Sequence, residues 1–63
     1  MITYRLSKAD VYISGEHRSD RWSCEVEANS ITEAYQKMVA VCRKEFKASK
    51  YAKIRLIGDV YGC

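Results

Sequence analysis

The chain has 63 residues, with eleven Lys and Arg against eight Asp and Glu and a net charge of +3. This length allows one small domain, residues 1–63, and 48% hydrophobic residues is too many for a disordered chain. The charge is too small for a nucleic-acid binder driven by charge alone. The longest apolar run, Met38–Cys42, is too short to span a membrane, and the N-terminal residues predict a strand rather than a signal peptide, so we expect a cytoplasmic protein with no membrane partner.

The segment Ile2–Ile13 is predicted to be one long strand with a bulge. Apolar residues occupy even positions from Ile2 to Leu6 and odd positions from Ala9 to Ile13. Because side chains alternate between the two faces of a strand, this change of parity requires an irregularity near residues 7–10. The polar segment 14–20, which contains a glycine, is predicted to form a hairpin connection to a second strand, Arg21–Ala28.

A helix is expected to follow, from Ile31 to about Phe46. Ser30 and Glu33 match the S-x-x-E capping box, in which the serine hydroxyl accepts a bond from the Glu33 N–H and the carboxylate reaches back to the Ser30 N–H. Glu45 is expected to lie near enough to the helix end to reach water. At 100° per residue, one face collects the apolar side chains: Ile31, Ala34, Tyr35, Met38, Val41, Cys42 and Phe46.

The segment Tyr51–Tyr61 is the last predicted strand, so the order of elements is ββαβ. A hairpin makes the first two strands antiparallel, and the simplest sheet places the third strand beside the first. The predicted fold class is therefore α+β, with one helix packed on a three-stranded antiparallel sheet of order 2-1-3.

The sheet face opposite the helix is expected to be open to solvent or to a partner. The alternation places arginine, isoleucine and tyrosine on this face, a mixture typical of protein interfaces. Glu25 and Glu27 share the face, and we expect them to pair with neighbouring cations rather than to act as acid–base catalysts. The predicted binding residues are Arg5, Lys53, Arg55, Ile57 and Tyr61.

The cysteines and the histidine do not predict a catalytic or metal site. Cys24, Cys42, Cys63 and His17 lack the close ligand pairs of zinc sites. Cys24 and Cys42 are expected to be small buried residues, whereas Cys63, the last residue, is expected to react with alkylating reagents. The sequence also has no glycine-rich phosphate-binding motif. We therefore expect no enzymatic activity, no metal and no cofactor.

A second candidate surface is a basic stripe along the outer helix face and the turn that follows. Cations near a helix C-terminus are favoured by the helix dipole, so solvation alone explains the stripe. Its alternative role is contact with the phosphates of RNA or DNA. The residues of this basic stripe are Lys37, Arg43, Lys44, Lys47 and Lys50.

The junction between the second strand and the helix carries a loose resemblance. Val26–Ala28, Ser30 and Glu33–Ala34, followed by a helix, a basic turn and Ile54–Ile57, resemble the small ββαβ ribosomal protein of archaeal large subunits. They also resemble many short phage and mobile-element proteins that carry a strand followed by A-x-S-x-x-E-A and a helix. The ribosomal resemblance implies RNA binding, but the glycine-containing turn that follows the helix in that family is missing here.

The expected function is a non-enzymatic binding module of the phage or mobile-element kind. Its expected partner is a host protein or ribonucleoprotein, which it engages and modulates in the host cytoplasm. The alternative is binding of RNA or DNA through the basic stripe. A third interpretation is a homodimer that covers its own exposed sheet edge or face.

Overall fold

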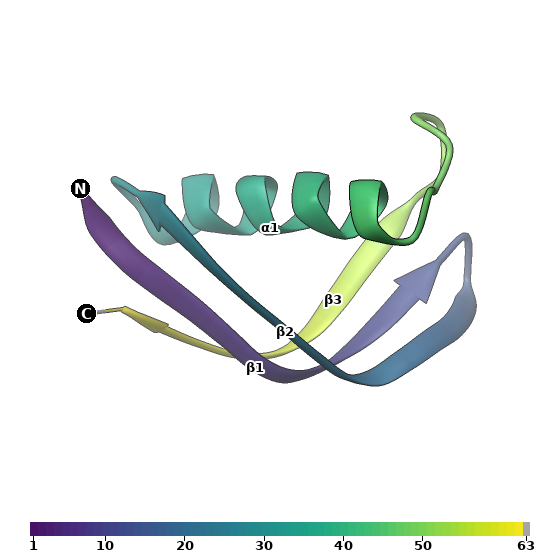
Figure 1. The fold of residues 1–63 in the computed structure, drawn as a ribbon, viewed down its shortest axis with the longest axis horizontal. Helices are drawn as coiled ribbons and strands as arrows, with labels where there is room; N and C mark the ends of the chain where they lie inside the picture. Colours follow the sequence, from purple (N-terminus) through teal and green to yellow (C-terminus); the bar gives the residue numbers. More distant parts are fainter. Residues whose placement is uncertain (63) are drawn as a thin grey trace.

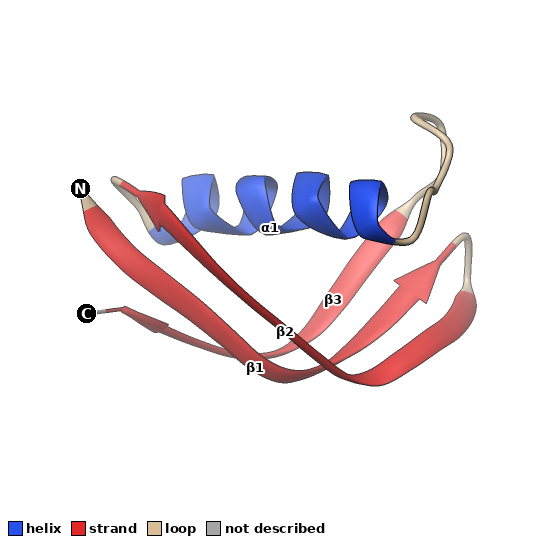
Figure 2. Ribbon diagram, viewed as in Figure 1, coloured by secondary structure: helices blue, strands red, loops and turns tan. Residues whose placement is uncertain are grey.

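A computed structural model describes residues 1–62 of the chain. Its strands are β1 (Ile2–Ile13), β2 (Glu16–Ala28) and β3 (Ile54–Gly62), and helix α1 spans Ile31–Glu45 (Figure 1). The strands form one antiparallel sheet of order β2-β1-β3, with the helix over one face (Figure 2). The predicted α+β fold, its ββαβ order and its sheet topology are confirmed.

The sheet bends at the bulge that the change of parity predicted. The pairing of β1 with β2 shifts register between Leu6 and Ala9, and the pairing of β1 with β3 shifts at the same place. Lys8 lies at this point with a φ of 52°, in the left-handed region that non-glycine residues rarely adopt. Gly58 of β3 faces the bulge, where a Cβ would lie 3.1 Å from Ala9 Cα. The strands therefore curve around α1, which lies across the concave side of the sheet (Figure 1).

One face of α1 and the concave face of the sheet form the core. The predicted apolar face of the helix was too wide, because Ile31, Tyr35 and Val41 are 56%, 37% and 38% exposed. Three strands span only about 10 Å across the sheet, so a helix of similar diameter buries one row of side chains and the flanking rows point past the sheet. The buried row of the helix is Ala34, Met38 and Cys42, and the buried residues of the core cluster are Leu6, Ala9, Val11, Ile13, Trp22, Met38, Cys42 and Leu56.

Trp22 of β2 is hydrogen-bonded to the end of the helix. Its indole Nε1 donates to Glu45 Oε2 over 2.5 Å, while the residue itself is only 8% exposed. The expectation that Glu45 simply reaches water was therefore incomplete. The carboxylate accepts the one hydrogen bond that a buried indole needs to make.

The helix N-terminus is capped by Ser30 as predicted. Ser30 Oγ accepts a hydrogen bond from the Glu33 N–H over 3.2 Å. The return bond of the capping box is replaced, because Glu33 Oε1 lies 3.4 Å from Lys37 Nζ one turn further along the helix.

The helix C-terminus closes with a Schellman motif built on a lysine. Lys47 has a φ of 53° and its N–H donates to the Lys44 carbonyl over 3.3 Å. The Ala48 N–H donates to the Arg43 carbonyl over 2.9 Å. These are the two bonds of the motif, in which glycine usually holds the left-handed position.

The β1–β2 connection is shorter than predicted. Its turn is Ser14–Gly15, and both residues have positive φ, 52° and 82°, as a two-residue type I′ hairpin requires. As a result, β2 begins at Glu16 instead of Arg21. Residues 16–20 lie in a strand but are almost all exposed, so they lack the alternating burial that would have indicated one.

Two further findings complete the description. Within residues 1–62, no helix is long and apolar enough to cross a membrane. Cys63, which was expected to be reactive, lies outside the described residues.

Candidate binding surface

The face of the sheet opposite α1, here called the outer face, carries a row of side chains at its hairpin end. Tyr12 of β1 pairs with His17 of β2 on one side and with Arg55 of β3 on the other. The rings of Tyr12 and His17 lie 5.0 Å apart, tilted by 44°. His17 Nε2 lies 3.3 Å from Asp10 Oδ1, and Asp10 pairs with Ile57 of β3. All three strands therefore contribute to one continuous patch.

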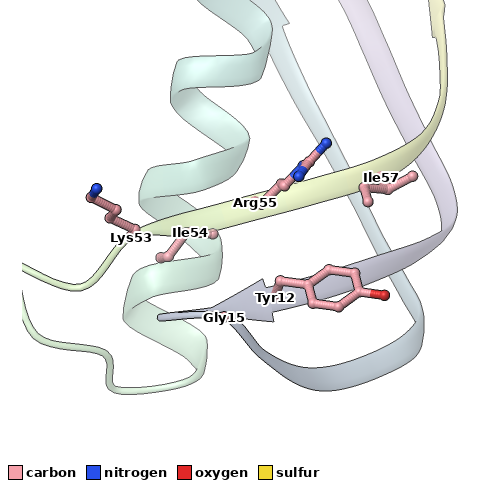
Figure 3. Close-up of a pocket in the computed structure, with 6 residues that line it drawn as sticks. All are labelled: Tyr12, Gly15, Lys53, Ile54, Arg55 and Ile57. Carbon is pink, nitrogen blue, oxygen red and sulfur yellow. The ribbon is translucent and has the colours of Figure 1, made fainter.

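A shallow depression of about 690 Å³ lies at the same end of the molecule (Figure 3). Figure 3 shows Tyr12 and Ile57 pointing to the same side of the sheet, while Lys53 extends away from the Tyr12 ring. The Ser14 N–H donates to the Lys53 carbonyl over 2.7 Å, which ties the hairpin turn to the start of β3. The depression has apolar walls with cations beside them, so it suits an apolar side chain of another molecule that is flanked by acidic groups. The lining residues are Tyr12, Gly15, Lys53, Ile54, Arg55 and Ile57.

The five residues predicted for this face fall into two groups. Lys53, Arg55 and Ile57 meet at the depression. Arg5 and Tyr61 are cross-strand neighbours on the other side of the bend. Arg5 Nη2 forms an ion pair with Glu25 Oε2 at 2.8 Å, which confirms the expected pairing for Glu25 but not for Glu27, and Tyr61 is 56% exposed. The bend at the bulge separates the two groups.

Asp10 and His17 were missed by the sequence analysis. With segment 14–20 predicted as a hairpin connection, His17 was expected outside the sheet, whereas it lies in β2. Recognising Ser14–Gly15 as a two-residue turn would have set the register and placed His17 directly opposite Tyr12. The missing signal was therefore the type of turn.

The structure gives two members of the basic stripe internal contacts. Lys37 Nζ donates to the Glu27 carbonyl over 2.5 Å, at the outer edge of β2. Arg43 is half-buried, and its Nη1 donates to the carbonyls of Ser49 and Ala52. The two bonds of Arg43 hold the segment 48–53 outside the sheet, and β3 begins at Ile54 and not at Tyr51 as predicted.

The other three members of the stripe are exposed. Lys44 lies in the last turn of α1, and Lys47 follows the helix end. Within the described part of the chain, neither side chain makes an ion pair or a hydrogen bond. Lys50 Nζ lies 5.1 Å above the Tyr51 ring, a cation–π contact on the surface. Three cations on a helix end and a loop remain as a candidate anion-binding surface.

The two described cysteines lie on the helix side of the sheet, away from the histidine. Cys42 is buried and Cys24 is half-buried against the core, so the prediction of burial holds fully for Cys42 alone. Burial, and second the negative charge of Glu45, raise the pKa of both thiols above the ordinary value of 9.0. His17 lies on the outer face, so it cannot act as a base for either thiol. Within residues 1–62, no group of three or more metal-ligating side chains comes together.

Comparison with known proteins gave no match: no protein-family model fits the sequence, and neither the curated proteins nor the solved structures contain a significant relative of it.

Proposed function

We propose that the protein is a non-enzymatic module that binds a partner protein through the outer face of its sheet. The observation that carries this proposal is the patch at the hairpin end, where Tyr12 and Ile57 lie beside Arg55 around a surface depression. Ile57 is 44% exposed, whereas the neighbouring Leu56 of β3 is almost completely buried. An exposed isoleucine, an aromatic ring and an arginine on one face is the composition that dominates binding energy at protein interfaces.

The charges of the patch indicate what kind of surface it fits. Asp10 already lies beside His17, whereas the side chains of Lys53 and Arg55 make no ion pair within residues 1–62. The patch therefore offers apolar contact area next to unneutralised positive charge. Its complement is a partner surface with an apolar side chain flanked by aspartate or glutamate. In line with the resemblance of the strand–helix junction to short phage and mobile-element proteins, the partner we propose is a host protein or a protein component of a ribonucleoprotein.

The second candidate function is binding of RNA or DNA through Lys44, Lys47 and Lys50. Their exposure supports it, but the internal bonds of Lys37 and Arg43 remove two of the five cations from the stripe. Three cations can contact few phosphates. The steepness with which the logarithm of the affinity falls with the logarithm of the salt concentration is proportional to the number of phosphates contacted. The two candidate functions therefore differ in the surface used and in salt dependence.

The experiment compares two double variants, one on each candidate surface. Wild-type protein is used to capture and identify a partner from cells of its source, and the purified partner is then titrated against Tyr12→Ala/Arg55→Ala and against Lys44→Glu/Lys47→Glu. We expect the first variant to weaken binding at least about tenfold, because it loses two anchors of the interface. The second variant should leave the affinity within about twofold of the wild type. The reverse result would place the partner on the basic stripe and overturn the proposal.

A further inference from the structure

The outer edge of β3 presents unpaired backbone groups along half of its length. The Leu56 N–H points away from β1, because its hydrogen-bond acceptor is the hydroxyl of Tyr35 on the helix, at 3.2 Å. Backbone direction alternates along a strand, so the N–H and C=O groups of Gly58 and Val60 also point away from β1. Within residues 1–62, no side chain forms a hydrogen bond with the backbone groups of Gly58 or Val60. This edge is therefore open for pairing with another strand.

The other edge of the sheet is protected in the usual way. Lys37 Nζ occupies the Glu27 carbonyl on the outer edge of β2, and exposed charged side chains line that strand. Charged residues on an edge strand oppose pairing with another chain. The edge strand β3 also carries charged side chains, Arg55 and Asp59, but they are of opposite sign and flank Ile57 at its centre. The uncapped backbone groups and the exposed isoleucine mark β3, and not β2, as a pairing edge.

We propose that two copies of the chain pair through this edge of β3, antiparallel, with Leu56 of each copy opposite Gly58 of the other. The two-fold axis then passes beside Ile57, which lies opposite Ile57 of the second copy. On the outer face, Arg55 lies opposite Asp59 of the second copy, and Asp59 lies opposite its Arg55. These are the non-hydrogen-bonded positions of the new ladder, where opposed side chains approach most closely.

The charges of β3 select this register. Arg55 and Asp59 lie about 13 Å apart along one strand, too far to pair with each other, and neither side chain has a partner within residues 1–62. A register centred on Asp59 would oppose two aspartates, and one centred on Arg55 would oppose two arginines. A register centred on Gly58 would oppose Ile57 and Asp59. The register centred on Ile57 satisfies both charges twice and covers an isoleucine that is 44% exposed.

Pairing in this register requires Tyr35 to release the Leu56 N–H. The two residues of the new ladder at this point, Leu56 and Gly58, exchange their backbone bonds, so the tyrosine hydroxyl and the second strand compete for one donor. Tyr35 is 37% exposed, so its side chain already borders solvent. Tyr35 therefore acts as a competitor that weakens the dimer, which is a testable role for its hydroxyl.

The resulting dimer has a continuous six-stranded sheet of order 2-1-3-3-1-2, with both helices on one side. Its two outer faces join into one surface, and Arg55 and Ile57, which line the depression, then lie at the seam between the copies. This inference goes beyond the proposed function, because its test needs no partner protein, although Arg55 and Ile57 belong to both surfaces.

The test is sedimentation velocity of the full chain over a wide range of concentrations, in excess reductant so that disulfides cannot link copies. We expect a concentration-dependent dimer for the wild type. Arg55→Asp and Asp59→Arg should each raise the dimer dissociation constant at least about tenfold, because both symmetry-related ion pairs become repulsive. The double variant Arg55→Asp/Asp59→Arg should restore wild-type dimerisation, and so should an equimolar mixture of the two single variants. Tyr35→Phe should lower the dissociation constant.

The mixture controls for misfolding, since two unfolded variants cannot complement each other. A wild-type protein and a Tyr35→Phe variant that both remain monomeric at every concentration would overturn the proposal. A dimer that persists in both single variants would also overturn it. So would a dimer that is lost in the single variants and is restored neither by the double variant nor by the mixture. In either case the interface would not oppose Arg55 to Asp59.

Discussion

The half-buried arginine at the end of α1 gives the sharpest stability prediction. In Arg43→Met the side chain keeps a similar length and helix propensity but loses its donors. The guanidinium Nη1 bonds the Ser49 carbonyl and, at 3.0 Å, the partly buried Ala52 carbonyl. Hydrogen bonds to charged groups contribute about 1.5–3 kcal/mol each, and water can replace part of the more exposed one. We therefore expect Arg43→Met to lower the free energy of unfolding by about 2 kcal/mol.

The assay is urea denaturation followed by tryptophan fluorescence, since Trp22 lies in the core. In a domain of this size, a loss of about 2 kcal/mol corresponds to a fall in Tm of about 10 °C. The matched control is Lys44→Met, the adjacent exposed residue, for which we expect a change within about 0.5 kcal/mol. Equal stability of the two variants would show that the carbonyl bonds of Arg43 do not hold the segment 48–53, and would return Arg43 to the candidate anion-binding surface.

Three further predictions concern the core, the helix start and the thiols. Leu56→Ala, at a core residue of β3, should lower the free energy of unfolding by about 2 to 5 kcal/mol in urea, and an unchanged midpoint would mean that the assigned face of β3 is wrong. Ser30→Ala should lower the free energy of unfolding by about 1 kcal/mol, while Ser30→Asp retains most of the stability, because the cap needs a side-chain acceptor. Equal urea midpoints for all three proteins would show that Ser30 does not stabilise the helix start. Cys42 should resist alkylation until denaturant is added and Cys24 should react slowly, as mass spectrometry of labelled protein will report; equal labelling of both at the rate of an unfolded chain would contradict their burial. Because burial raises the pKa of both thiols, they stay protonated in the folded protein at a pH where the unfolded thiols ionise. The free energy of unfolding should therefore fall as the pH rises above 9.0, and it should fall more in the wild type than in Cys24→Ala/Cys42→Ala.

The elements of the fold were predictable because each depends on residues close together in the sequence. The change of parity between Leu6 and Ala9 indicates a bulge wherever the strand lies in the sheet, and Ser30 marks the helix start through its own hydroxyl. Only one helix and three strands had to be arranged, and short connections leave few arrangements. The order 2-1-3 followed from these constraints.

What the sequence did not reveal depends on contacts between segments whose relative positions periodicity does not define. The width of the buried helix face is set by a sheet that is only three strands wide, so Tyr35 and Val41 are more exposed than helical periodicity predicts. The role of Arg43 depends on carbonyls six and nine residues further along the chain, in a segment whose path periodicity does not define. Both cases require the tertiary arrangement.

The candidate site was predicted in part for the same reasons. Alternation along β3 placed Arg55 and Ile57 on the outer face, and the structure brings them to one depression. The contribution of His17 depended on the length of a turn, since a one-residue change in register moves every side chain of the strand to the other face.

The most direct test of the proposed binding face is a map of the bound surface. Amide chemical shifts of isotope-labelled protein are followed by NMR while the purified partner is added. The proposal predicts that the largest changes cluster on the outer face, at Tyr12, His17, Arg55 and Ile57, with little change at Lys44 and Lys47. Changes concentrated at Lys44, Lys47 and Lys50, with the outer face unaffected, would contradict it and favour the candidate anion-binding surface.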